Sequence, residues 1–493
     1  MISSSDVLRL GIPGIGKAMA AALRDSNLAI NAGMPQQAVE DALARLAQSS
    51  DPLSEDLGSL SERMHELAQV LADLTRDQQA WHARPSPAPW RCWSCGYDDP
   101  LAKEQMVEAC SLPVSVSGAL MPDSHMGYGL PIGGVLAVRD AVIPYAVGVD
   151  IACRMRISVL DIPWGDFDKV RDGLKEALKT QAMLGVGVKF QPGKILDHEV
   201  MALPGWKELP IPRQIYQKAA CQLGTSGSGN HFVEFGRLIV PADINEPGLK
   251  LKLKQGEYLA LLSHSGSRGA GEAVAEYYSS LATYLCRGMP QELKRLAWLG
   301  LGTAEGQEYW ESMQLMGRYA CANHELIHRR IAAFLGATIT ASAENHHNFA
   351  WKENYGDEEL IVHRKGATPA GAGVLGVIPG SMGDCGFIVR GKGNVASYCS
   401  CSHGAGRLMS RKQAFNTLDR AKMAEILEDR GITLLSGSLD ESPEVYKPIE
   451  AVLKAQGDLV DILAKFEPKL VRMAPEARNR KARGRGTGKA APK

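Results

Sequence analysis

Clusters of glycine separate short apolar segments throughout residues 115–475, and few folds accommodate that pattern. The clusters lie at 127–134, 224–229, 266–271 and 366–383. The apolar segments predict strands at 136–139, 157–160, 258–262 and 387–390, and helical periodicity predicts helices at 171–182 and 271–287. Glycine lets the backbone approach a ligand closely, and several such loops together suit a phosphate-rich site. We therefore expect an α+β fold with mixed sheets, in which glycine-rich loops build the functional site.

The first 80 residues follow a different pattern, because their apolar residues recur at helical spacing. These are Ala38, Val39, Ala42, Leu43 and Leu46, then Leu60, Met64, Leu67, Val70 and Leu71. Residues 11–16 (GIPGIG) precede a further apolar helix and resemble a helix-hairpin-helix signature, in which backbone N–H groups contact a phosphate. A glycine turn that starts a helix is the simpler interpretation. We expect a helical N-terminal extension over residues 1–80.

Proline and charge mark the remaining boundaries. The proline-rich residues 84–90 predict an extended linker, so we assign 81–114 to a linker and lead-in and 115–475 to one large domain. The chain has 55 basic and 55 acidic residues, and this zero net charge, taken as an average, argues against a nucleic-acid partner. The average hides a tail at 476–493, where seven Lys or Arg residues face one acidic residue, Glu476. We expect this basic tail to be disordered.

The apolar runs and the cysteines indicate the cellular compartment. No apolar run approaches the roughly 18 residues that a membrane span needs, and the first 25 residues lack a signal-peptide core. The ten cysteines are scattered rather than arranged as a disulfide framework. We expect a cytoplasmic protein without a membrane partner, whose cysteines are reduced.

Four histidines lie in polar, glycine-flanked settings: His231, His264, His347 and His403. A single histidine of this kind is more often structural than a ligand, but four together are harder to dismiss. Asp150 and Cys153 add a carboxylate and a potential thiolate three residues apart. Asp, Cys and three His provide ligands for one metal ion, or for a pair bridged by the thiolate, and they suit Mn²⁺, Zn²⁺ or Fe²⁺. Such a pair would clamp phosphoryl oxygens.

Two other metal patterns are weaker. Cys92 and Cys95 have the spacing of a metal knuckle, but no second pair follows at zinc-finger distance. His324, Glu325 and His328 match the HExxH pattern of zinc hydrolases, but no third ligand is evident nearby. We interpret both histidines as structural. Basic residues gather beside the other histidine and glycine motifs, and we expect them to bind phosphates: Arg268, Arg364, Lys365, Arg407 and Arg411.

Seven strings occur in one order along residues 115–450 and together resemble the RtcB-type RNA ligases. They are MPDSHMGYGLPIGG at 121–134, GVDIAC at 148–153, GTSGSGNH at 224–231, HSGSRG at 264–269, HRKGAT at 363–368, IPGSMG at 378–383 and SHGAGR at 402–407. The resemblance implies a ligase that joins an RNA 3′-phosphate or 2′,3′-cyclic phosphate to a 5′-hydroxyl, driven by GTP with two Mn²⁺ ions. It also implies a role in RNA repair or tRNA splicing, with a possible archease-like activator.

The resemblance assigns roles to individual residues. His403 would attack GTP and carry GMP, and Asp123 would orient it by accepting a hydrogen bond from a ring N–H; both are candidate catalytic residues. Asp150, Cys153, His231, His264 and His347 would be the metal ligands, with Cys153 as the bridge. The guanine nucleotide would contact Asn230, Glu234, Asn348, Ser381, Gly404, Ala405, Gly406 and Tyr446. Glu234 would accept hydrogen bonds from guanine.

The sequence departs from the family pattern in three places. Ala152 and Arg154 stand where the family commonly has glycine on either side of Cys153, and Gly386 replaces a frequent serine. The sequence aligns without the lysine of the short Lys-Gly terminus that reaches the nucleotide in the family, and Lys469 and Arg472 are candidates to replace it.

Two alternatives stay open at this point. One is a metal-dependent phosphoesterase or nucleotidyl transferase that caps 3′-phosphates without sealing. The other is a non-catalytic RNA-binding scaffold. For all three readings we expect local phosphate contacts, to which the basic tail adds a salt-dependent contribution.

Overall fold

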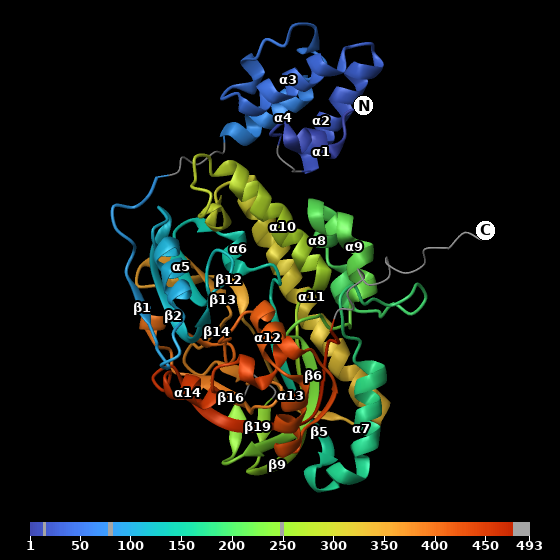
Figure 1. Ribbon diagram of the computed structural model, residues 1–493, viewed down its shortest axis with the longest axis vertical. Coiled ribbons are helices and arrows are strands. Elements are labelled where there is room, and N and C mark those ends of the chain that lie inside the picture. Colours follow the sequence, from blue (N-terminus) through green and yellow to red (C-terminus); the bar gives the residue numbers. More distant parts are fainter. Residues whose placement is uncertain (13–15, 77–81, 247–250, 477–493) are drawn as a thin grey trace, which may run out of the picture.

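The computed structural model describes residues 1–12, 16–76, 82–246 and 251–476 (Figure 1). Helices and strands alternate through the main body, which confirms the expected mixture of helix and sheet. The basic tail predicted to be disordered lies outside the described residues, except for Glu476. Residues 13–15 of the helix-hairpin-helix candidate lie outside them too.

Four helices make up the described part of the N-terminal extension, at the top of Figure 1: α1 (Ser4–Arg9), α2 (Gly16–Asn31), α3 (Gln36–Gln48) and α4 (His65–Arg76). Short 3₁₀ turns at Pro52–Ser54 and Gly58–Leu60 connect α3 to α4. Val39, Leu43, Leu46, Met64 and Leu67 are buried, so the helical periodicity of the sequence marks the inner faces of these helices.

A five-stranded sheet follows, with strand order β1-β2-β3-β13-β12. Its strands are β1 (Trp90–Cys92), β2 (Ser115–His125), β3 (Ile132–Val138), β13 (Glu358–Lys365) and β12 (Asn348–Tyr355), and helix α5 (Pro100–Cys110) packs on β2. The proline-rich segment runs beside α5, where the backbone N–H of Ala88 donates to Cys110 O at 2.7 Å. The segment then continues into β1, which pairs with β2 in parallel.

A second, eight-stranded sheet has the order β11-β5-β9-β6-β19-β16-β15, with β18 added in parallel to β19. Its strands are β11 (Ile339–His346), β5 (Arg154–Pro163), β9 (Gly256–Ser265), β6 (Phe232–Val240), β19 (Val460–Met473), β16 (Gly386–Gly391), β15 (Leu375–Ile378) and β18 (Thr433–Ser436). Three of the strands predicted from the sequence fall within β5, β9 and β16, and the fourth falls mostly within β3.

Helices cover one side of this sheet, as Figure 1 shows for the long helix α11 (Ala304–Leu335) beside α10 (Arg268–Leu285). Helices α7 (Phe167–Gln181), α8 (Gly205–Glu208) and α9 (Pro210–Gln222) pack around them. Tyr309, Met313 and Met316 of α11 are fully buried and join the largest apolar core. The helix therefore holds the back of β5 and β9 in place.

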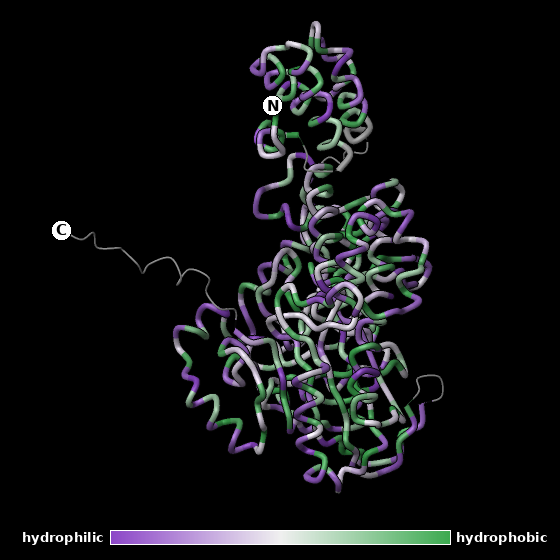
Figure 2. The backbone as a smooth tube through the Cα atoms, turned by 90° about the vertical axis from the view of Figure 1, so that its right-hand side faces the viewer, coloured by the Kyte–Doolittle hydropathy of each residue, from purple (hydrophilic) through white to green (hydrophobic). Residues whose placement is uncertain are grey.

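The remaining elements are short. Three two-stranded pairs join β4 (Ala141–Val142) to β10 (Leu299–Gly300), β7 (Ile244–Glu246) to β8 (Leu251–Leu253) and β14 (Ala367–Pro369) to β17 (Ser400–Ser402). Four helices complete the chain: α6 (Pro144–Val147), α12 (Arg411–Thr417), α13 (Arg420–Asp429) and α14 (Ile449–Lys454). Figure 2 shows hydrophilic and hydrophobic residues interspersed along the chain, and none of the described helices is long and apolar enough to cross a membrane.

Candidate active site

Adjacent strands of the eight-stranded sheet bring the predicted metal ligands to one end of the sheet. Cys153 directly precedes β5, His231 directly precedes β6, and His264 is the penultimate residue of β9. His347 lies between β11 and β12. Because these strands are neighbours in the order β11-β5-β9-β6, four ligands far apart in sequence meet at one end of the sheet. They line a cavity of about 870 Å³.

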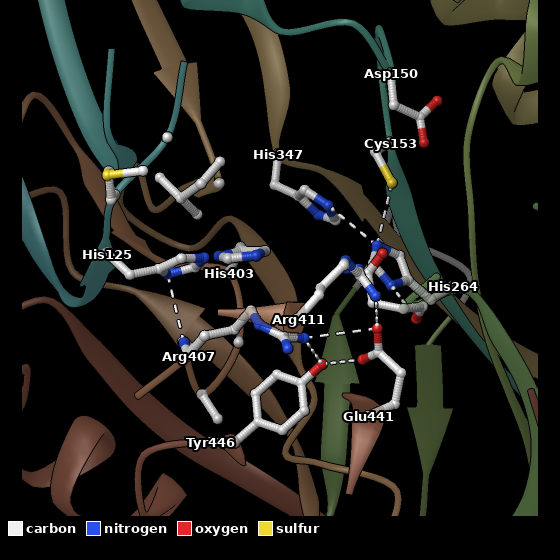
Figure 3. Close-up of a pocket in the computed structure, with 18 of the residues that line it drawn as sticks. His125, Asp150, Cys153, His264, His347, His403, Arg407, Arg411, Glu441 and Tyr446 are labelled. Carbon is white, nitrogen blue, oxygen red and sulfur yellow. Dashed lines mark hydrogen bonds and ion pairs between the residues drawn. The ribbon is translucent and has the colours of Figure 1, made fainter. Parts of the chain in front are cut away.

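The ligand atoms face one another (Figure 3). Cys153 Sγ lies 3.1 Å from His264 Nε2 and 3.4 Å from His231 Nε2. His264 Nε2 lies 3.2 Å from His347 Nε2, and His231 Nε2 lies 3.0 Å from Asp150 Oδ2. The structure thus brings together all five residues that the sequence proposed as metal ligands.

This cluster fits a metal ion. Cys153, His231 and His264 are buried, and their ligand atoms lie within 4.8 Å of one another. Burial and the neighbouring histidines lower the pKa of His264 to about 3, so its ring is neutral. The backbone carbonyl of Asn230 lies 3.1 Å from His264 Nδ1 and accepts a hydrogen bond from Nδ1–H, which leaves Nε2 with a free lone pair for a metal.

Two further observations support the fit. The Nδ1 atoms of His231 and His347 are buried and have no hydrogen-bond partner among the described residues. Burial also raises the pKa of the Cys153 thiol well above its ordinary value. A bound cation would reverse that effect, because a thiol that coordinates a metal is deprotonated.

A carboxylate fixes the ring of His403 beside the ligand cluster. His403 Nδ1 lies 2.7 Å from Asp123 Oδ2, and the same oxygen accepts the backbone N–H groups of His403 at 3.1 Å and Gly404 at 3.2 Å. Burial alone would raise the pKa of Asp123, but the charge and hydrogen bond of His403 outweigh it and lower the pKa. With Nδ1 bound to Asp123, Nε2 is the nitrogen that remains for chemistry. The His403 ring centroid lies 4.8 Å from that of His347.

Glycine is required at two points around these side chains. A Cβ atom on Gly406, whose φ is +75°, would lie 1.9 Å from the backbone oxygen of Asp123. A Cβ atom on Gly227 would lie 1.8 Å from His231 Nδ1. Both contacts are far shorter than non-bonded atoms allow. These glycines therefore let the loops close around the histidine and the ligand cluster.

Most of the predicted nucleotide residues also line the cavity: Asn230, Asn348, Ser381, Gly404, Ala405, Gly406 and Tyr446. Asn348 bridges two loops, since its Nδ2 donates to Asp150 O at 3.2 Å and its Oδ1 accepts Gly366 N–H at 2.8 Å. Glu234 lies deeper, on β6 two residues beyond Phe232, and is not among the lining residues. Burial raises the pKa of Glu234 well above its ordinary value.

Three of the five predicted phosphate-binding cations line the cavity: Lys365, Arg407 and Arg411. The guanidinium of Arg407 lies over the ring of Tyr446, 5.4 Å from its centroid, and Arg411 Nη1 lies 2.5 Å from Asp440 Oδ2 (Figure 3 shows Arg407, Arg411 and Tyr446). Lys365 Nζ donates to the backbone oxygens of Tyr128 and, at 2.9 Å, Tyr145.

The structure does not bring the other two cations to the cavity. Arg364 is 1% exposed, and its guanidinium donates to Glu353 at 2.7 Å and 3.0 Å and to Tyr398 O at 2.6 Å. Because this guanidinium is buried and already paired, Arg364 stabilises the five-stranded sheet instead of binding phosphate. Arg268 donates to Thr225 Oγ1 at 3.1 Å and to Gly185 O at 3.3 Å, behind the ligand loops.

The weaker metal patterns have structural explanations. The Oγ atom of Ser263 lies 3.0 Å from His324 Nδ1 and 2.8 Å from His328 Nε2, so both rings are buried behind β9. Cys95 Sγ donates to Pro122 O at 3.1 Å. Among the described residues, neither pair belongs to a group of three or more metal-type ligands.

The structure shows the surroundings of the residues that depart from the family pattern. Ala152 adopts a positive φ of 56°, a region that favours glycine. Arg154 Nη1 lies 3.4 Å from Glu344 Oε1, away from the cavity. Arg472 donates to Lys179 O at 2.6 Å and Ala182 O at 2.8 Å at the end of α7, so it does not supply the missing lysine. Nothing in the structure explains Gly386.

Some lining residues were missed by the sequence reasoning. Glu441 is 1% exposed, binds Arg411 and Tyr446, and lines the cavity together with His125 and Met473. The acidic pair Asp440 and Glu441, six and five residues before the predicted Tyr446, was the sequence feature that could have indicated this contact.

The mixed sheets and this constellation of histidines define a known family of enzymes. Residues 105–474 match the family described as tRNA-splicing ligase RtcB, and the chain belongs to that family.

Individual relatives agree. The chain is 32% identical over 406 residues to the RNA-splicing ligase RtcB of Escherichia coli K12, and the match covers 76% of this chain and 95% of the relative. It is 30% identical over 436 residues to the tRNA-splicing ligase RtcB of Thermococcus kodakarensis, covering 74% of this chain and 89% of the relative. An RNA-splicing ligase RtcB from Mycobacterium bovis is 29% identical over 432 residues.

Proposed function

We propose that this protein is an RNA ligase that joins a 3′-phosphate or 2′,3′-cyclic phosphate end to a 5′-hydroxyl end, using GTP, in RNA repair or tRNA splicing. The observation that carries the proposal is the pairing of His403 with buried Asp123 at a cavity shared with five metal-type ligands. The names of the relatives, which are RNA-splicing and tRNA-splicing ligases, point to the same reaction.

In the first step, His403 Nε2 attacks the α-phosphorus of GTP. A nitrogen–phosphorus bond forms, the bond from the α-phosphorus to the bridging oxygen breaks, and pyrophosphate leaves. Asp123 keeps Nδ1–H bound throughout and offsets the positive charge that develops on the ring.

In the second step the guanylyl group passes from His403 to the RNA 3′-phosphate, which restores the histidine and forms a phosphoanhydride. The 5′-hydroxyl oxygen then attacks the activated phosphate, a phosphodiester forms, GMP leaves and the hydroxyl proton is released. Activation is needed because a 3′-phosphate by itself has no good leaving group. A 2′,3′-cyclic phosphate end would first be opened to the 3′-phosphate.

Asp150, Cys153, His231, His264 and His347 would hold the metal, which we propose to be Mn²⁺ with two ions in the site. When bound, the metal neutralises phosphate charge during the exchange of bonds. Cys153 Sγ lies within hydrogen-bonding distance of two of the three histidines, which supports our proposal that the thiolate would be a ligand shared by the two ions.

The guanine nucleotide would bind along the loop that precedes β6 and the loop that follows β17. We propose contacts to Asn230, Asn348, Ser381, Tyr446 and the Gly404–Ala405–Gly406 turn. We also propose that Glu234, which lies below the cavity, accepts hydrogen bonds from guanine N1–H and N2–H₂. Burial raises the pKa of this carboxyl, and the two guanine donors would favour its ionised form. Lys365, Arg407 and Arg411 would bind phosphate oxygens.

A product analysis separates this function from its alternatives. The protein is incubated with GTP, Mn²⁺ and two RNA strands, one ending in a labelled 3′-phosphate and the other beginning with a 5′-hydroxyl. A ligase incorporates the labelled phosphate into an internal phosphodiester of a longer strand, where phosphatase cannot remove it. A phosphoesterase releases inorganic phosphate, a capping transferase leaves a guanylylated end unjoined, and a scaffold leaves both strands unchanged. An archease-like protein is added in parallel, because we propose that such a partner activates the enzyme.

A further inference from the structure

The loop between β2 and β3 carries two large exposed side chains at the mouth of the cavity. Met126 is 53% exposed and Tyr128 is 57% exposed, and both line the cavity. Isolated exposed apolar side chains are ordinary on a protein surface. Here they border the reaction cavity, and their exposure calls for an explanation from the loop itself.

The loop is held tightly by hydrogen bonds to its backbone. The backbone N–H of Met126 donates to Asp99 Oδ2 at 2.7 Å. Gln105 contacts Gly127 twice, accepting its N–H at 2.9 Å and donating to its carbonyl at 2.8 Å. Lys365 Nζ donates to the carbonyl of Tyr128. The Tyr128 ring is therefore exposed on an anchored loop.

An arginine stacks on the exposed ring. The guanidinium carbon of Arg295 lies 4.5 Å from the Tyr128 ring centroid, within the range of a cation–π contact. Arg295 belongs to the 3₁₀ turn Lys294–Leu296 and is itself exposed. A Cβ atom on Gly129 would lie 2.8 Å from Arg295 O, so the two segments are in close contact. The arginine covers part of the ring and more than half of the tyrosine stays open to a ligand.

We propose that Tyr128, backed by Arg295, is a stacking platform for a nucleobase of the RNA strand that brings the 3′-phosphate. This inference rests on the proposed function. Aromatic rings bind the bases of single-stranded RNA with little dependence on sequence, and an adjacent arginine adds attraction for base and backbone. Because Tyr128 is at the mouth, its ligand must extend out of the cavity, as a strand does and an enclosed nucleotide does not.

The platform is tested by binding of a fluorescent RNA oligonucleotide with a 3′-phosphate, without GTP. A matched oligonucleotide lacks the bases of its last three nucleotides. Tyr128→Ala is expected to weaken binding of the normal RNA by about 10-fold, within the effect of base–aromatic stacking. It should not change binding of the abasic RNA, for which wild-type protein should already show the weaker affinity. Tyr128→Phe should keep wild-type binding, and Arg295→Ala should weaken binding of the normal RNA more than binding of the abasic RNA, which loses only the attraction for the backbone.

Tyr97→Ala is the control, because Tyr97 is 44% exposed and is not among the residues that line the cavity. Equal binding of both RNAs by Tyr128→Ala and wild-type protein would overturn the proposal. An equal loss of affinity for both RNAs would also overturn it, because Tyr128 would then contact the RNA backbone. An increased KM for GTP in self-labelling would overturn it as well, because Tyr128 would then contact the guanine nucleotide. The binding assay requires no ligation, so tyrosine-dependent base binding by a protein that never seals RNA would refute the proposed function alone.

Discussion

His403 Nδ1 lies 2.7 Å from Oδ2 of Asp123, and that single oxygen also accepts two backbone N–H groups of the same turn. The carboxylate therefore sets both the tautomer of the ring and the position of the loop. Asp123 is fully buried, so no water competes for this oxygen.

Replacing Asp123 by Asn tests this relationship. The amide keeps the shape of the side chain but removes the charge that stabilises the developing imidazolium. The rate of GMP transfer to the protein in a single turnover is expected to fall by about 10³-fold or more, as when the carboxylate partner of a catalytic histidine is lost. Thermal unfolding serves as the control for folding. Labelling of Asp123→Asn at the wild-type rate would remove Asp123 from the catalytic machinery.

The metal site can be tested without measuring activity. Cys153→Ala is expected to weaken Mn²⁺ binding by at least about 100-fold, measured by electron paramagnetic resonance of free Mn²⁺, because the thiol contacts two histidine ligands. Cys401→Ala is the matched control, since Cys401 is equally buried but lies outside the ligand group. Equal Mn²⁺ affinity of the two variants would show that Cys153 is not a ligand.

Asn323 of α11 links two ligand-bearing loops. Its Oδ1 accepts Gly224 N–H at 2.7 Å, and its Nδ2 donates to Thr225 O at 2.9 Å and Ser265 Oγ at 3.2 Å. Asn323→Ala should lower Mn²⁺ affinity by about 10- to 100-fold, because the loops before His231 and after His264 lose their common anchor.

Tyr319→Phe controls for general damage to the helix. Tyr319 is buried on the same helix, and its hydroxyl donates to Ala219 O at 2.8 Å. This variant should lose about 1 kcal/mol of stability but retain wild-type Mn²⁺ affinity. If both variants lost the same affinity, Asn323 would have only a general structural role.

Lys365 gives a prediction about pH. Burial, together with the charge of Arg295, lowers the pKa of Lys365 from its ordinary 10.5 to about 7. Between these values the unfolded chain binds a proton that the folded protein does not, so the free energy of unfolding rises with pH. Between pH 7 and pH 10.5 the free energy of unfolding rises by up to about 1.4 kcal/mol per pH unit. Below pH 7 the folded protein also binds the proton, and this rise with pH disappears.

Denaturant unfolding at pH 7, 8 and 9 in the presence of a chelator measures this contribution. Lys365→Met should flatten the rise of unfolding free energy with pH, and Lys392→Met, a partly exposed lysine paired with Asp461, should not. Parallel pH profiles for Lys365→Met and the wild type would mean that the pKa of Lys365 is unperturbed.

The proximity of the proposed ligands could be predicted because each of them lies in a short string at or near a strand end. Cys153, His231 and His264 precede or end adjacent strands, so local motifs carried most of the information about the site. Which basic residues line the cavity was harder to predict from the sequence. Arg364 and Arg407 look alike beside glycine-rich motifs, but Arg364 forms an ion pair with Glu353 on the neighbouring strand β12. The register sets Arg364 opposite Phe349 and Glu353 opposite Leu360, so this pair runs diagonally between the strands and is visible only in the folded structure.

Contacts between distant parts of the chain had the same effect on other residues. Arg472 stood near the expected position of the family's lysine, yet its guanidinium binds the last carbonyls of α7, some 290 residues earlier in the chain. Glu441 was missed because its contacts with Arg411 and Tyr446 form only when the loop after β18 folds over the cavity.

The central claim is that His403 is the nucleophile that carries GMP. The direct measurement is incubation with GTP labelled at the α-phosphate and Mn²⁺, followed by denaturing electrophoresis and peptide mapping. The proposed function predicts an acid-labile, base-stable label on the peptide that contains His403, and no label on His403→Ala. Retention of the label by His403→Ala, or its location on any other residue, would contradict the claim.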